Sequence, residues 1–372
     1  MTQKHKQIIP PAILTASLLL TLALIVHTVL LGGNVGSQSA QEGGVFRLGS
    51  RFDDFIARKS AVCMGQAEEP PTVYKLSDTD LVAPKPRQEN YGTFGTAREM
   101  APILEAASGL LDGQTMYFST ETELMPDTQI HYYLDESIFA VTWKEAHEGI
   151  AFTYSEVKIA HPTQFRRFLS GGKYASGVQT LCSEMAASVN AVVAINGDFY
   201  AYRHSGTNVY NGKVYRHDES GLHTCHIDEN GDLRFVYGGE MNSKDAVQAY
   251  VDENNIRFCL CFGPVMVDNG DLQKVSNYYL GEVNEDFSRA AICQMDTLHY
   301  LLVTANYEGR QFFLPTMSKF ARIVHATGCQ KAYALDGGQS ATLIMNNAVI
   351  NQVSYDNERK QSDIIYFATA VP

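Results

Sequence analysis

The stretch from Tyr333 to Thr342 holds residue types that can do chemistry. An apolar run ends on a carboxylate, Asp336, passes through Gly337 and Gly338, and offers a hydroxyl at Ser340. A carboxylate held at the end of a strand can serve a reaction, and glycines beside it let a ligand approach the backbone closely. A plain Asp-Gly turn between two strands explains the same residues. From this stretch alone the two interpretations are evenly balanced.

A second stretch repeats this layout. The apolar run Ala191–Ile195 predicts a buried strand, and Asn196, Gly197 and Asp198 follow it. The simple alternative is an Asn-Gly turn that leaves Asp198 in solvent. Two strands that end in this way can instead bring Asn196, Asp198 and Asp336 into one cleft. We expect that cleft to be the functional site.

Two arginines and a strand break are further candidates for the functional site. Arg289 enters an apolar strand, where a charged side chain needs a partner, and its planar fork suits a phosphate or a carboxylate. A structural salt bridge is the default explanation for Arg289. Arg359 precedes the final strand, where charge also protects a sheet edge. The Gly263-Pro264 pair interrupts another strand and predicts a bulge or a close backbone approach to a ligand.

Composition bounds the class of protein. The chain has 372 residues, 45% of them apolar, which is enough for a sizeable core. Its formal charge of -12 disfavours nucleic acid as a partner. Seven cysteines lack the regular spacing of a disulfide scaffold. Cys182 and Cys225 could pair, whereas Cys259, Cys261 and Cys293 lie in apolar strands and read as small buried side chains.

The N-terminus predicts a membrane anchor. Residues 1–7 are basic, and the apolar run Ile8–Leu31 is long enough to span a bilayer with the N-terminus in the cytoplasm. A cleaved signal peptide is the alternative. Residues 32–128 begin with a flexible stalk and read as a partly helical juxtamembrane module, in which Thr96 caps a helix that runs to Leu111.

Residues 129–372 predict the main domain. Strand-like runs cover residues 130–134, 138–143, 149–160, 209–215, 256–261, 265–267, 289–294, 298–304 and 331–335. Helical patterns cover residues 174–189 and 317–327. The fold class is therefore α+β, a mixed β-sheet domain with flanking helices.

Taken in order, several motifs resemble the phosphodiester glycosidase family. They are Ile195–Tyr200, Asn211–Arg216, Phe262–Pro264, Arg289–Ile292, Leu335–Thr342 and Arg359–Asp363, and the resemblance spans residues 148–367. Two positions depart from the family pattern. Gln339 replaces a third glycine, and Asp198 stands where many members have a small or apolar residue.

The resemblance implies hydrolysis of a sugar-1-phosphodiester without a cofactor or a metal. It suggests Asp336, Asp198 and Arg289 as catalytic residues, with Arg289 on the phosphate. Substrate would also contact Asn196, Arg359 and the turn of Gly337, Gly338 and Ser340. The expected enzyme acts outside the cell on an envelope glycan. Two alternatives remain, an inactive module that binds anionic surface polysaccharide and a scaffold in an envelope assembly whose protein partners are unknown.

Overall fold

The computed structural model describes residues 73–372 except 79, 219 and 310. The predicted tail, residues 1–7, and the predicted anchor, Ile8–Leu31, lie outside the described residues, as do residues 32–72 of the juxtamembrane module. Within the described part of the chain, no helix is both long enough and apolar enough to cross a membrane.

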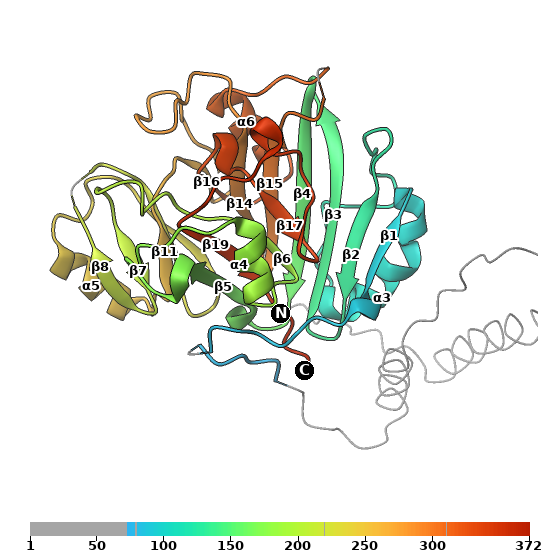
Figure 1. The fold of residues 1–372 in the computed structure, drawn as a ribbon, viewed down its shortest axis with the longest axis horizontal. Coiled ribbons are helices and arrows are strands. Elements are labelled where there is room, and N and C mark those ends of the chain that lie inside the picture. The colour runs from blue at the N-terminus through green and yellow to red at the C-terminus, as the bar shows by residue number, and fades with distance from the viewer. Residues whose placement is uncertain (1–72, 79, 219, 310) are drawn as a thin grey trace, which may run out of the picture. The chain divides into compact units, whose positions relative to one another are not determined.

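A nine-stranded sheet forms the centre of the domain (Figure 1). Its strands, in spatial order, are β1 (Tyr91–Phe94), β2 (Ile130–Leu134), β3 (Ile138–His147), β4 (Ile150–Ile159), β15 (His299–Asn306), β14 (Arg289–Asp296), β16 (Lys331–Leu335), β12 (Val265–Asp268) and β13 (Asp271–Leu272). The sequence places β2, β3 and β4 one after another with short turns, and they pair as an antiparallel meander.

Two five-stranded sheets pack on one face of the large sheet. One contains β10 (Leu233–Val236), β9 (Thr224–Ile227), β11 (Phe258–Leu260), β7 (Asn208–Tyr210) and β8 (Lys213–Arg216). The other contains β18 (Ala348–Val349), β17 (Leu343–Met345), β6 (Val193–Asn196), β19 (Asp363–Phe367) and β5 (Phe165–Leu169). Their apolar side chains share a buried core with alternate residues of the large sheet, among them Ile292, Leu302 and Leu335.

Helices cover the outer faces. The helices α3 (Ala101–Leu111) and α6 (Met317–His325) pack on the other face of the large sheet. The helix α4 (Cys182–Ser188) packs on β6 and β19, and α5 (Lys244–Glu253) packs on β8. Short 3-10 turns occupy Gln88–Asn90, Ala97–Met100, Pro162–Gln164, Ser170–Gly172, Gly338–Ser340 and Ser354–Asp356. The α+β class with few helices is confirmed.

The domain begins earlier than the sequence predicted. Residues 91–128 are not a spacer, because β1 pairs with β2 and the buried side chains of Met100 and Ile103 belong to the main core. The predicted cap at Thr96 is present, since the Glu99 side chain accepts the Thr96 N–H at 2.9 Å. The sequence boundary at residue 129 is therefore wrong for the segment that carries β1 and α3.

Three local predictions also need correction. Every strand pairing among the described residues is antiparallel, so the sheet is not mixed in strand direction. The helix predicted over residues 174–189 shrinks to α4, because Ala175 and Gly177 have positive φ. The strand predicted over residues 209–215 is the hairpin β7–β8, turned at Asn211-Gly212. The predicted bulge near Pro264 is present in β12.

The described cysteines are all free and buried. Cys182 does not pair with Cys225. Cys259, Cys261 and Cys293 are packed as small apolar side chains, as the sequence predicts. No disulfide therefore joins the sheets within residues 73–372.

Candidate active site

Asp336 lies directly after β16, the third strand from the β13 edge of the large sheet, and the turn that follows requires glycine. A Cβ atom on Gly337 would lie 2.5 Å from the carbonyl oxygen of Ser288, and Gly338 has φ +60°. The Gly338 N–H donates to the same carbonyl at 2.8 Å. That donor is bound within the protein, which contradicts its predicted contact with a phosphate. The glycines serve close packing of the turn against the start of β14.

Asn196 holds the Asp336 turn from the neighbouring sheet. Its Nδ2 donates to the Asp336 carbonyl at 2.8 Å, and its Oδ1 accepts the Thr342 N–H at 3.1 Å. The side chain is fully buried. The predicted convergence of Asn196 and Asp336 is present, but both ends of the amide are used. Asn196 therefore positions the turn, and its complete burial does not support the predicted direct contact with substrate.

Asp336 carries a buried carboxylate without a complete set of partners. Its Oδ2 is buried and unpaired, and so is the Oγ of Ser340. Burial raises the pKa of Asp336 to about 6, while the nearby Ser340 hydroxyl and the charge of Arg359 oppose the rise. Ser340 is thus close enough to affect Asp336 although the two make no well-formed hydrogen bond. Unpaired buried polar groups of this kind are typical of sites that await a ligand.

Asp198 is close to Asp336, but both of its carboxylate oxygens already accept hydrogen bonds within the protein. Its Oδ2 accepts the Cys261 N–H at 2.9 Å, and its Oδ1 accepts a bond from Arg203 at 3.3 Å. The negative charge of Asp198 contributes to the raised pKa of Asp336, and the positive charge of Arg203 opposes it. Both carboxylate oxygens are committed, so the geometry does not support the predicted role of Asp198 as a second reacting carboxylate. It positions Arg203 beside Asp336.

Asp363 and Arg167 form a buried ion pair beneath this cluster. The Arg167 Nε donates to Asp363 Oδ2 at 2.6 Å, and Asp363 Oδ1 accepts the Asp198 N–H at 2.9 Å. A Cβ on Gly197 would lie 2.4 Å from the Asp363 carboxylate, which explains the glycine there. Burial raises the pKa of Asp363 above its ordinary value, and the charge of Arg167 opposes that rise and favours the ionised carboxylate.

Arg359 provides the accessible cation near Asp336. Its guanidinium carbon lies 4.6 Å from the ring centroid of Tyr202 and 5.1 Å from that of Phe199. The side chain is half-buried, and within the described chain its guanidinium makes no hydrogen bond or ion pair. Its charge is near enough to lower the pKa of Asp336. Arg359 therefore has its fork free for an anion, and its predicted contact with substrate stays a prediction.

Arg289 does not join this site. Its guanidinium makes hydrogen bonds to the carbonyls of Gly281, Glu282, Glu285 and Pro315. Burial lowers its pKa to about 10. Side chains alternate along β14, so Arg289 points to the face that α6 covers, whereas Ala290 points toward the small sheets. The predicted phosphate contact is therefore wrong, and Arg289 fixes the loop of residues 281–285.

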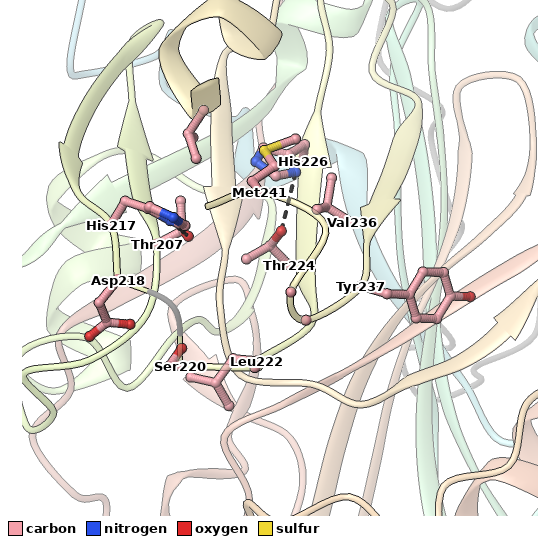
Figure 2. Close-up of a pocket in the computed structure, with 14 residues that line it drawn as sticks. Thr207, His217, Asp218, Ser220, Leu222, Thr224, His226, Val236, Tyr237 and Met241 are labelled. Atoms are coloured by element: carbon pink, nitrogen blue, oxygen red, sulfur yellow. Dashed lines mark hydrogen bonds between the residues drawn. The ribbon is translucent and has the colours of Figure 1, made fainter. Parts of the chain in front are cut away.

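Figure 2 shows a small cavity near β9 that is lined by Thr207, His217, Thr224 and His226. Its volume of about 20 Å³ is that of a single water site, too small for a sugar. Asp336 does not line it. Within residues 73–372, no group of three or more His, Cys, Asp or Glu side chains is arranged to hold a metal ion.

Sequence reasoning missed Arg167, Arg203 and Asp363. Arg167 lies inside the apolar strand β5, and Asp363 begins the apolar strand β19. The rule that drew attention to Arg289, a charge inside an apolar strand, applies to both of them. Applied to every strand, it would have suggested a buried pair. Nothing in the local sequence separates Arg203 from other surface arginines.

Comparisons with known proteins found one family match and several similar structures. Residues 189–368 match the family model described as phosphodiester glycosidase. The catalytic domain of zebrafish N-acetylglucosamine-1-phosphodiester alpha-N-acetylglucosaminidase, auto-inhibited by its pro-peptide, is 16% identical with a TM-score of 0.50, covering 70% of this chain and 92% of that one. A hypothetical protein from Synechocystis is 14% identical with a TM-score of 0.44, covering 62% of each chain. A putative exported protein from Burkholderia pseudomallei K96243 is 12% identical with a TM-score of 0.38, covering 59% of this chain and 74% of that one. No curated protein matches the chain.

Replacing Arg289 by methionine tests its structural role. We expect the melting temperature to fall by several degrees, because buried carbonyls lose a charged donor at about 1–3 kcal/mol each when left unpaired. The KM of the folded Arg289→Met variant for its substrate should stay close to that of the wild type. Thermal denaturation and steady-state kinetics measure the two effects. A stable variant with a greatly raised KM would return Arg289 to the substrate site.

Proposed function

From the match of residues 189–368 to the phosphodiester glycosidase family, we propose that the protein hydrolyses a sugar-1-phosphodiester. Water replaces the phosphate at the anomeric carbon, so the glycosidic C–O bond breaks and the products are a free sugar and a phosphomonoester. The observation that carries the proposal is the buried, partly unpaired carboxylate of Asp336 within electrostatic reach of the guanidinium of Arg359, which makes no hydrogen bond or ion pair in the described chain.

The two side chains match the charges that develop in this reaction. Positive charge grows at the anomeric carbon, and an ionised Asp336 stabilises it or activates the attacking water. Negative charge grows on the departing phosphate, and the fork of Arg359 can hold two of its oxygens. Phosphate is already a good leaving group, so a strong general acid is less necessary than for an ordinary glycoside. One free carboxylate and one free cation suffice for this scheme.

Three buried side chains assist the reaction by holding other groups in place. They are Asn196, Asp198 and Asp363. Asn196 fixes the backbone of Asp336, and Asp198 holds Arg203 within electrostatic reach of the same carboxylate. Such bonds keep a reacting group within a narrow range of positions, as catalysis demands. We also propose the Ser340 hydroxyl as a contact for substrate, because its oxygen is buried and unpaired beside Asp336.

A module that binds anionic glycans without cleaving them is the second candidate. The observation in its favour is that Asp198 has no free oxygen, which leaves a single available carboxylate at the site. A synthetic sugar phosphodiester with a chromogenic alcohol on the phosphate distinguishes the two when the assay is coupled to a phosphatase. Turnover supports the hydrolase. Saturable binding with no sugar released supports the module.

The location remains a proposal that rests on the sequence. Lys4 and Lys6 precede the apolar run Ile8–Leu31, so we propose a single-pass anchor with the domain outside the cell, acting on an envelope glycan. Protease digestion of intact cells, with a tag at the C-terminus, tests the orientation. A tag protected from protease would refute it.

Replacing Asp336 by asparagine should lower kcat/KM by about a hundredfold or more, because the charge opposite the forming cation is lost. The wild-type kcat/KM should fall as the pH drops below about 6, since protonation neutralises the same carboxylate. Rate measurements from pH 4 to pH 8 test both statements. Full activity of Asp336→Asn would remove Asp336 from the mechanism.

The same variant should be more stable than the wild type at pH 8. A pKa raised from 3.8 to about 6 means that the folded state binds the proton more tightly, so Asp336 contributes stability below pH 4 and loses it as the pH rises through 6. The difference is at most about 3 kcal/mol. Denaturant unfolding at pH 5 and pH 8 measures it, with the exposed Asp271→Asn as control. Equal stability of Asp336→Asn and wild type at pH 8 contradicts the buried, uncompensated charge.

Replacing Arg359 by alanine should raise KM about tenfold, because a charge-assisted contact with the phosphate is lost. Arg359→Lys keeps the charge but loses the planar fork and its stacking on the aromatic rings. The KM of Arg359→Lys should therefore lie between that of the wild type and that of Arg359→Ala. Lys360→Ala is the matched control, since Lys360 is the exposed neighbour. An unchanged KM in Arg359→Ala would mean that the substrate phosphate binds elsewhere.

A further inference from the structure

A second cavity lies between the two small sheets and is separate from Asp336. Its volume is about 340 Å³, and β5 and β19 contribute one wall while β7 and β11 contribute the other. We call it the arginine cavity, because Arg166, Arg167 and Arg257 all line it. This volume lies in the range of pockets that hold small organic ligands.

Positive charge exceeds negative charge at this cavity. Arg167 is neutralised by Asp363, and Arg257 contacts Asp78 at 3.0 Å. Arg166 has no carboxylate partner within the described residues, since it donates to the Tyr366 hydroxyl and to backbone carbonyls. Arg167 also lies 4.0 Å from Asp198, so Arg166 is the one arginine of the cavity lining that has no carboxylate partner among the described residues, in a chain whose overall formal charge is -12. The local excess of positive charge favours an anionic occupant.

Arg257 is the cation that a ligand can reach most directly. The Asp78 side chain that pairs with it is 58% exposed, so a competing anion can displace it at little cost. Burial lowers the pKa of Arg257, and the charge of Arg166 adds to this effect while Asp78 opposes it. The two guanidinium groups therefore repel each other, and an anion between them would relieve that repulsion.

The remaining walls suit a compact ring-shaped body. Phe168, Ile256 and Phe258 supply apolar surface. Tyr210 and Asn211 also line the cavity, and neither the Tyr210 hydroxyl nor the Asn211 side-chain amide has a hydrogen-bond partner in the described part of the chain. A ligand that offers hydroxyl groups could pair with both. A bare ion would leave these walls unused.

From the cavity, its excess charge and its unpaired polar groups, we propose that the arginine cavity binds a small organic phosphate of about monosaccharide size. The phosphate displaces Asp78 and pairs with Arg257, while Arg166 contributes its charge. The ring of the ligand packs on Phe168 and Phe258, and its hydroxyls meet Tyr210 and Asn211. This site does not depend on the proposed hydrolysis at Asp336.

Calorimetric titration of the full chain with glucose 6-phosphate tests the proposal. The Arg359→Ala background removes the free cation at the candidate active site, so any binding seen there is independent of that site. We expect saturable binding that Arg257→Gln weakens about tenfold. Arg234→Gln is the matched control, because Arg234 pairs with Asp228 and does not line the cavity.

The substitution Asp78→Asn tests the proposal by the direction in which the affinity for glucose 6-phosphate changes. It removes the competitor for Arg257, so affinity for glucose 6-phosphate should rise by about threefold or more, whereas a purely structural ion pair predicts no gain. This variant alters an exposed side chain, so it tests the proposal even if Arg257→Gln fails to fold. Affinity that is unchanged in Asp78→Asn, or equal affinity for inorganic phosphate, overturns the proposal.

Discussion

The buried ion pair between Arg167 and Asp363 joins the elements from which the candidate site is built. Both side chains are fully buried, and their Nε and Oδ2 atoms lie 2.6 Å apart. The same arginine also donates to the Cys259 carbonyl in the other small sheet, and the same aspartate accepts the Asp198 N–H. Two charges this deep depend on each other, because either one left alone would be uncompensated in the interior. The relative placement of the strand ends therefore rests on this pair.

Three neighbouring aspartates show how environment separates structural from reactive carboxylates. Asp363 is neutralised by a buried arginine, and Asp198 has hydrogen-bond donors on both oxygens. Asp336 shares their depth but keeps one oxygen unpaired. Asp363 and Asp198 are fully bonded and hold neighbouring groups in position, whereas the carboxylate of Asp336 lacks a full set of hydrogen bonds. Proteins commonly accept such local instability where a group must react or bind.

Much of the fold was predictable because local patterns agreed with it. The apolar run Lys331–Leu335 forms β16 with the bounds that the sequence indicates, and the capping residues at Thr96 and Glu99 mark a real helix start. The place of residues 91–128 was not predictable, because pairing of β1 with β2 joins segments separated by an intervening helix and loop. No local signal specifies such a long-range contact.

Part of the candidate site was also predictable, because some of its features are visible in the local sequence and others are not. Strand ends were correctly seen to bring Asn196 and Asp336 together, because a polar residue that follows a buried strand is visible in the sequence. The direction of a side chain depends on the strand's register, which the sequence does not show. Arg289 was therefore assigned to the wrong face, and Arg167, which lies on the right one, was not considered.

The buried thiols give this domain a set of internal reporters. Cys293 lies in β14 of the large sheet, Cys259 in β11 of one small sheet, and Cys182 in the helix that packs on the other. Burial raises the pKa of all three, to about 12 for Cys259, so an alkylating reagent must wait for the surrounding structure to open. The alkylation rate at each position would then measure how often that layer opens in the native protein. Without added labels, the alkylation rates could thus reveal whether the three sheets unfold together or one at a time.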